Sequence, residues 1–281
     1  MRSWLLALLA AFGIAHVSFA TDTPREWSFV LDPYFRGLGG YSALHVSNDG
    51  NDILLISDAG DWLIAQLDRP TGNFEIKSRG DLNDPAHMPI RDDQSDAEGL
   101  AIGNDGRIYV SFEGVARVWS YNALSGEAAW LPRHPDFQEM QENASLEALA
   151  IASDGAIYTI PERSGAKARP FPVYRYQNGE WSIPFTLPRR GNFLVVGADV
   201  GPDGYLYVLE RSFGLLGFAS RIRRFDLNGE SEEEIWTGQY DNLEGIALWQ
   251  DHHGRLIASL ISDNNFLSVQ KTLLVEVVID Y

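Results

Sequence analysis

The sequence contains no cysteine, which excludes disulfide bonds, thiolate catalysis and cysteine-ligated metal sites. If the protein is exported, the absence of cysteine fits a bacterial periplasm or cell exterior better than a eukaryotic secretory route. Basic residues are also scarce, because 22 Lys and Arg stand against 39 Asp and Glu and give a formal net charge of −17. A nucleic-acid partner is therefore not expected, since phosphate backbones require a basic surface.

Long apolar runs are absent after the first 20 residues. The stretch LLALLAAFGIA follows Arg2 and precedes small residues at Ser18 to Ala20, a pattern typical of a secretory signal peptide over residues 1–20. We expect a mature chain of residues 21–281, periplasmic or secreted and forming one domain, with no membrane span after cleavage. The sequence also lacks a Gly-x-Ser-x-Gly elbow, a phosphate-binding Walker loop, His-Glu-x-x-His and a dinucleotide fingerprint.

What is present is a repeat. Residues 98–113 read EGLAIGNDGRIYVSFE, and related segments occupy residues 42–58, 147–162, 196–211 and 244–263. Each segment contains a turn glycine, and successive turn glycines are 49 to 56 residues apart: Gly50, Gly106, Gly155, Gly204 and Gly254. A period in this range is typical of repeat architectures.

Each repeat predicts a β-hairpin followed by two weaker strands. Apolar residues alternate on both sides of an Asp-Gly turn, as in two half-buried strands joined by a tight hairpin. The weaker pairs are expected at 116–123 with 126–132, 172–179 with 180–188, and 220–229 with 231–238. Four antiparallel strands per unit describe the blade of a β-propeller. A β-sandwich is the alternative, but sandwiches rarely repeat a sequence this closely.

The ends of the chain indicate how the ring closes. The last unit supplies strands from 244–263 and from 271–279, and then lacks a fourth strand. The segment 25–32 has strand character but no blade of its own, so we expect it to complete the last blade. The prediction is an all-β propeller of about five four-stranded blades, with six possible if one connector contains a degenerate blade.

Acidic residues recur at two places in the repeat. If the first strand of each blade lines the central channel, its start and the end of the second strand lie at the same mouth. The acids at strand starts are Asp96, Glu98, Glu147, Asp241 and Glu244. The acids at strand ends are Asp58, Glu113, Glu162, Glu210 and Asp263. The fourth unit lacks a start acid and has Asp199 three residues further along.

A ring of carboxylates needs a counter-charge, because unpaired carboxylates repel strongly in a poorly solvated channel. Calcium is favoured, since it takes six to eight oxygen ligands and the chain lacks softer ligands at metal spacing. The predicted ligands are Asp58, Asp96, Glu98, Glu147, Glu162, Glu210, Asp241, Glu244, Asp263 and Asn264. The alternative is that Arg163 and Arg211 pair with these acids and tie neighbouring blades together. The two can coexist.

The motifs together resemble the phytase-like family, described as having esterase-like activity of phytase. They are Ser57-Asp58, Asp96-Ala97-Glu98-Gly99, Glu147-Ala148-Leu149, Leu209-Glu210-Arg211, Asp241-Asn242-Leu243-Glu244-Gly245, Ser262-Asp263-Asn264-Asn265 and Thr272-Leu273-Leu274. Asn264 departs from the family, which often has a second Asp there. The resemblance implies a secreted β-propeller that hydrolyses phosphate esters with calcium.

Three functions remain in competition. The first is a calcium-dependent phosphoesterase or esterase, in which Glu98, Glu147 and Glu244 hold metal or act as base, and Arg163 and Arg211 bind a small phosphate or ester ligand. The second is a hydrolase of neutral esters or lactones, with a histidine base from His45, His87, His134, His252 or His253. The third is a non-catalytic propeller that binds a ligand or protein through rim aromatics at Tyr34, Phe35, Phe137, Phe213, Phe218 and Tyr240.

Overall fold

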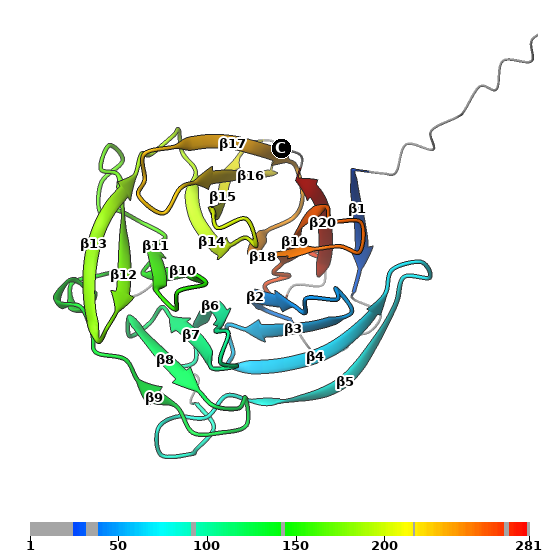
Figure 1. Cartoon of the computed structure of the whole chain (residues 1–281), viewed down its shortest axis with the longest axis horizontal. Coiled ribbons are helices and arrows are strands. Elements are labelled where there is room, and N and C mark those ends of the chain that lie inside the picture. Colours follow the sequence, from blue (N-terminus) through cyan, green and yellow to red (C-terminus); the bar gives the residue numbers. More distant parts are fainter. Residues whose placement is uncertain are drawn as a thin grey trace, which may run out of the picture.

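Five four-stranded antiparallel sheets are arranged as the blades of a propeller in the computed structural model (Figure 1). The structure describes residues 25–31, 39–90, 94–141, 144–215, 217–266 and 270–279. The predicted all-β propeller is confirmed with five blades rather than six. The proposed signal peptide lies outside the described residues. In the described part of the chain, no helix has the length and apolarity needed to cross a membrane.

Four blades follow the chain from the channel outwards. Blade 1 contains β2 (Tyr41–Val46), β3 (Asp52–Ser57), β4 (Asp61–Asp68) and β5 (Asn73–Asp81). Blade 2 contains β6 (Ala97–Ile102), β7 (Ile108–Phe112), β8 (Arg117–Tyr121) and β9 (Ala129–Trp130). Blade 3 contains β10 (Leu146–Ile151), β11 (Ile157–Pro161), β12 (Phe171–Gln177) and β13 (Glu180–Leu187). Blade 4 contains β14 (Leu194–Val200), β15 (Leu206–Gly214), β16 (Gly217–Phe225) and β17 (Glu232–Gly238).

Blade 5 joins the two ends of the described chain. It contains β18 (Leu243–Gln250), β19 (Leu256–Ser262), β20 (Leu273–Ile279) and the early strand β1 (Glu26–Val30), which pairs antiparallel with β20. Figure 1 shows β1 beside β20. Trp27 Nε1 donates to Glu276 Oε2 at 2.7 Å, and Arg69 of blade 1 pairs with Glu276 at 2.6 Å. The predicted closure by an N-terminal strand is therefore confirmed.

The inner hairpins turn at the predicted glycines. Gly106, Gly155 and Gly204 have φ of +80°, +83° and +82°, a region that glycine adopts without a Cβ clash. The preceding aspartate closes the turn, as when Asp154 Oδ1 accepts from the N–H of Ala156 at 3.0 Å. The repeat thus encodes five equivalent inner hairpins.

A β-bulge interrupts the innermost strand of every blade. The register between the first and second strands shifts by one residue at Ser42, Glu98, Glu147, Val196 and Glu244. A bulged residue is re-aimed relative to its strand, and bulges are common beside functional sites. Three of the five bulge positions carry glutamate, so the backbone irregularity and the predicted acid ring coincide.

Close packing of the inner strands nearly fills the channel. A Cβ on Gly99 would lie 2.6 Å from the Leu149 Cβ, and one on Gly245 would lie 2.9 Å from the Ser42 carbonyl oxygen. The space remaining among the inner strands is about 10 Å³. The packed inner strands therefore separate the acid-bearing mouth from a second cavity at the other end of the channel. This cavity has a volume of about 260 Å³ and is lined by His45 and Asp199, among others.

Candidate metal and substrate site

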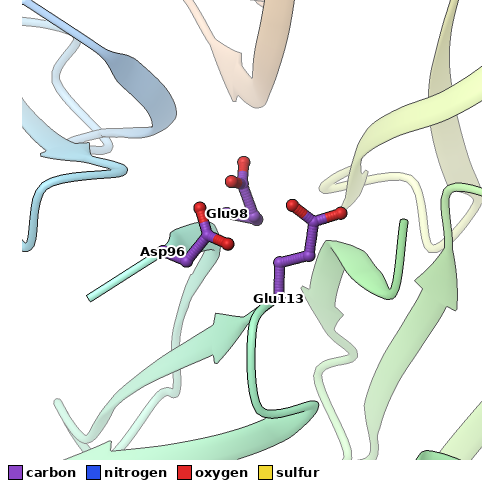
Figure 2. Close-up of side chains that lie close together, drawn as sticks. All are labelled: Asp96, Glu98 and Glu113. Carbon is purple, nitrogen blue, oxygen red and sulfur yellow. The ribbon is translucent and has the colours of Figure 1, made fainter. Parts of the chain in front are cut away.

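Three carboxylates from blade 2 form the closest acid cluster of the site. Asp96 precedes β6, Glu98 is its bulge residue, and Glu113 follows β7. One carboxylate oxygen of each lies within 4.8 Å of the others, and Figure 2 shows the three groups gathered at the ends of these strands. Glu98 and Glu113 are only 7% and 9% exposed. The cluster therefore has little water to screen the repulsion.

Burial and mutual repulsion raise the pKa values of this cluster. The pKa of Glu98 lies well above its usual range, because the side chain is buried and because Glu147 and Glu244 are close. Burial, and then the charge of Asp96, raises the pKa of Glu113 to about 7. Burial also raises the pKa of Asp96, against hydrogen bonds from the Gly114 N–H and the Glu98 carboxyl group. A bound cation would lower these pKa values, because it favours the ionised carboxylates.

Five further acids surround this cluster and complete the acidic mouth, which we define as Asp58, Asp96, Glu98, Glu113, Glu147, Glu162, Glu244 and Asp263. Burial, followed by the charges of Glu113 and Glu244, raises the pKa of Glu147 well above normal. Burial also raises the pKa of Asp58 to about 6 and that of Asp263 to about 7. Strand ends and bulges from blades 1, 2, 3 and 5 thus lie at one opening.

One oxygen of Asp58 is buried without a donor. Among the described residues, no hydrogen-bond partner reaches Asp58 Oδ1. The backbone of Gly40 packs directly against it, since a Cβ there would lie 2.2 Å from this oxygen. A buried acceptor without a donor costs free energy, which a bound cation or water would recover.

Arginine neutralises the opposite side of the acidic mouth. Arg211 on β15 donates from Nη1 to Glu244 Oε1 and to Asn242 Oδ1, and its Nη2 is 3.9 Å from Glu162 Oε1. Arg163 pairs with its neighbour Glu162 at 2.9 Å, and its side chain is 54% exposed. The predicted tie between blades therefore holds at Arg211, which connects blades 3, 4 and 5.

Glu210 lies apart from the acidic mouth, although its position in the repeat matches that of Glu162. It is fully buried inside blade 4 and accepts from Arg221 Nε at 2.6 Å and from Arg223 Nε at 2.8 Å. Arg223 Nη2 occupies its other oxygen. Both arginines come from the neighbouring strand β16, so Glu210 is saturated by internal partners.

Asp241 and Asn264, also predicted as ligands, hold loop backbone. Asp241 accepts from Gln270 Nε2 at 3.0 Å and from the Lys271 N–H at 3.3 Å. Asn264 Oδ1 accepts from the N–H groups of Gly40 at 3.3 Å and Phe266 at 3.0 Å. Their oxygens fix the segments beside the mouth.

The predicted aromatic rim and histidines are dispersed. Phe137 is buried under its connector, whereas Phe213 is 75% exposed and contacts Phe218 in a tilted arrangement, with ring centroids 4.9 Å apart. Tyr240 stacks on Trp236. Tyr34 and Phe35 lie outside the described residues. His252 and His253 occupy the hairpin turn of blade 5, and His45 lines the cavity at the far end of the channel.

Sequence reasoning placed Glu113 in the acid ring but did not single it out as a ligand. The structure puts it in the tightest cluster, where its backbone and side chain also anchor the next blade. Ser145 Oγ donates to the Glu113 carbonyl at 2.7 Å, and the Ser145 N–H donates to Glu113 Oε1 at 3.2 Å. The signal available was its repeat position, which it shares with Glu162 in the next blade.

The chain belongs to the phytase-like family, described as esterase-like activity of phytase, whose pattern it matches over residues 36–266. No curated protein matches the sequence. The family assignment agrees with the resemblance carried by the motifs and with the five-bladed fold.

Solved structures of other propellers are distantly similar. Regucalcin, a calcium-binding protein from Agrobacterium tumefaciens, is 14% identical with a TM-score of 0.47, over 86% of this chain and 78% of that one. The PQQ-bound aldose sugar dehydrogenase from Streptomyces coelicolor is 14% identical with a TM-score of 0.47, over 91% and 99%. Virginiamycin B lyase from Staphylococcus aureus is 14% identical with a TM-score of 0.45, over 84% and 69%. Similarity at this level carries no information about the chemistry of the site.

Proposed function

We propose that the protein is a calcium-dependent hydrolase of phosphate or other esters, exported to the periplasm or the cell exterior, with its reaction at the acidic mouth. The observation that carries the proposal is the cluster of Asp96, Glu98 and Glu113, whose carboxylate oxygens lie within 4.8 Å of one another. The ion pairs of the described residues reach Glu162, Glu210 and Glu244 but not this cluster.

The donor set fits a hard cation. It consists of carboxylate oxygens alone, on bulges and strand ends that fix their positions before any ligand arrives. Asp96, Glu98 and Glu113 would hold calcium, and Glu147 and the free oxygen of Asp58 stand beside them. When bound, the cation would offset the negative charge of an ester and favour ionisation of an attacking water.

The three glutamates predicted as catalytic have different surroundings. Glu98 belongs to the metal-binding cluster, and Glu244 is held by Arg211 and Asn242 Nδ2. Glu147 is buried between the two, with its pKa raised by burial and by neighbouring carboxylates. A nearby cation favours the ionised carboxylate, and in that form Glu147 would take the proton of the attacking water.

Arg211 would orient the substrate. Its guanidinium is 19% exposed and lies at the mouth, so it can donate to a phosphate or carbonyl oxygen while Glu244 keeps it in place. Arg163 is more exposed and would contact the outer part of the ligand.

The test is turnover of 4-nitrophenyl phosphate and 4-nitrophenyl acetate by metal-stripped protein, with and without calcium. We expect calcium-dependent hydrolysis of at least one ester, reduced at least 100-fold by Glu147→Gln. Hydrolysis that is equal with and without calcium, or unchanged in Glu147→Gln, would rule out this mechanism.

A second candidate is a non-catalytic ligand- or protein-binding propeller. It is favoured by the projecting hairpin of β15 and β16, where Phe213 and the fully exposed Leu215 present apolar surface beside the mouth. Exposed apolar patches often mark interaction sites. Calcium binding without turnover of any ester would favour this function.

A further inference from the structure

A cavity of about 690 Å³ lies on blade 3, outside the acidic mouth. Its walls come from three segments: the connector that precedes β10, the loop between β11 and β12, and the outer strands β12 and β13. Pockets that bury small organic ligands have volumes of ~300–1,000 Å³. The cavity is therefore large enough for the body of such a ligand.

One wall of the cavity is apolar. Met140, Pro161, Pro172 and Ile183 line it, and Ile183 is 41% exposed there. The short 3-10 helix η1 (Pro135–Gln138) supports this wall from the connector.

Helix η1 is anchored through aromatic contacts. Phe137 inserts between Tyr174 and Trp181, with ring centroids 5.1 and 5.2 Å away. Two acids, Asp136 and Glu139, also line the cavity, and the Tyr174 hydroxyl donates to Asp136 Oδ2 at 2.9 Å. The wall is thus formed before a ligand binds.

The other wall is basic, in a chain that carries a net charge of −17. Arg163 and Arg169 line the cavity from one loop, which also contains Lys167. Ser164 Oγ donates to the Arg169 carbonyl at 2.6 Å and closes the loop on itself. Two guanidinium groups beside an apolar wall suit a ligand with one anionic group and an apolar body.

The cavity adjoins the acidic mouth through shared residues. Arg163 pairs with Glu162 at 2.9 Å, and Glu162 faces Arg211 at 3.9 Å. Ala144 lines the cavity, and the next residue, Ser145, donates to Glu113 in the acid cluster. A ligand in the cavity would therefore have its charged end next to the carboxylates.

We infer that the blade-3 cavity binds an organic anion with a single phosphate or carboxylate group and an aryl or alkyl body. Polyanions such as inositol hexakisphosphate would meet too few cations in the cavity and many carboxylates beside it. The assignment of this ligand as the substrate rests on the hydrolase function proposed above, whereas its binding does not.

Binding of 1-naphthylmethylphosphonate, measured by calorimetry, tests the inference without turnover. We expect it to bind the full-length mature protein at least tenfold more tightly than methylphosphonate or inositol hexakisphosphate. Ile183→Asp should weaken binding of the naphthyl compound at least tenfold, because the substitution puts a charge on the apolar wall. Ser182→Asp is the matched control, since it adds the same charge to the adjacent position of β13, which does not line the cavity. It should change affinity less than twofold.

A second pair of variants tests the basic wall. Arg169→Ala should weaken binding of the naphthyl compound at least fivefold. Lys167→Ala changes the same loop at a residue that does not line the cavity, so it should change the affinity less than twofold. Equal effects within either pair of variants, or tighter binding of the hexakisphosphate, would overturn the inference.

The outcome also separates this inference from the proposed function. Selective binding that Ile183→Asp abolishes, in a protein without calcium-dependent turnover, would uphold the cavity and reject the hydrolase. Calcium-dependent turnover with no change in naphthyl binding or KM in Ile183→Asp would uphold the hydrolase and reject the cavity.

Discussion

Arg211 of blade 4 donates a hydrogen bond to Glu244 of blade 5, and this pair divides the acidic mouth into two parts. On its side, Glu162 and Glu244 have an arginine as counter-charge. On the other side, no ion pair within the described part of the chain reaches Asp96, Glu98 or Glu113, whose carboxylates lie together. Arginine pairs therefore account for one sector of the carboxylate ring, and the proposed cation site concerns the other.

Replacing Arg211 with methionine should lower the free energy of unfolding by about 3 kcal/mol, because it leaves Glu244 and Asn242 without their shared donor. Arg163→Met is the control, since Arg163 is half exposed and its pair with Glu162 should contribute below about 1 kcal/mol. Urea unfolding in calcium-free buffer measures both. Similar losses in the two variants would contradict the assigned role of Arg211.

Amide substitution of two buried glutamates, Glu147 and Glu210, should change the stability of the protein in opposite directions. Glu147→Gln removes a carboxylate from a repulsive cluster, so stability without calcium should stay the same or rise by up to about 1 kcal/mol. Glu210→Gln removes the buried carboxylate that Arg221 and Arg223 share. It leaves them paired with the more exposed Glu234 and Glu232, and should cost about 3 kcal/mol. Chemical denaturation of both variants would refute this contrast if Glu147→Gln were the more damaging change.

Two glycines separate backbone strain from close packing. Gly155→Ala should destabilise by about 1 kcal/mol, since φ is +83° and nothing lies within 4 Å of the added Cβ. Gly99→Ala should cost more, about 2–3 kcal/mol, because its Cβ would lie 2.6 Å from Leu149 Cβ and separate blades 2 and 3. Thermal unfolding that ranked the two variants in the reverse order would show that the inner strands tolerate wider spacing.

Asp199 should make stability depend on pH. Burial raises its pKa to about 7, against hydrogen bonds from the N–H groups of Leu248 and Val200. Because the folded state then binds a proton that the unfolded state releases above about pH 4, this group's contribution is present at low pH and is lost as pH rises towards 7.

Asp199→Asn removes this titration. The stability difference between wild type and Asp199→Asn should shift in favour of the variant between about pH 4 and 7, by up to about 1.4 kcal/mol per pH unit. Urea unfolding across this range measures it. A constant difference at every pH would mean that Asp199 keeps an ordinary pKa in the folded protein.

The fold could be predicted from the sequence because its signals are local. The Asp-Gly turns repeat with the blade, and each turn sets a hairpin whose strands alternate in the usual way. Closure of the ring was also predictable, because the segment that forms β1 has strand character and the last repeat lacks a fourth strand of its own.

The site was only partly predictable, because its chemistry depends on which strands pair. Glu113, Glu162 and Glu210 occupy the same place in the repeat, yet Glu210 pairs with Arg221 and Arg223 across the β15–β16 register. Nothing near Glu210 in the sequence indicates that register. The blade-3 cavity combines residues from connectors and outer strands, such as Met140 and Ile183, which lack a repeated pattern.

Calorimetric titration of calcium into metal-stripped wild type and Glu98→Gln tests directly whether a cation binds at the acidic mouth. We expect saturable binding to the wild type and binding at least tenfold weaker to Glu98→Gln. Glu210→Gln is the control, and it should keep the wild-type affinity where it remains folded. Absence of calcium binding to the wild type, or equal affinity in Glu98→Gln, would contradict a cation site at the acidic mouth.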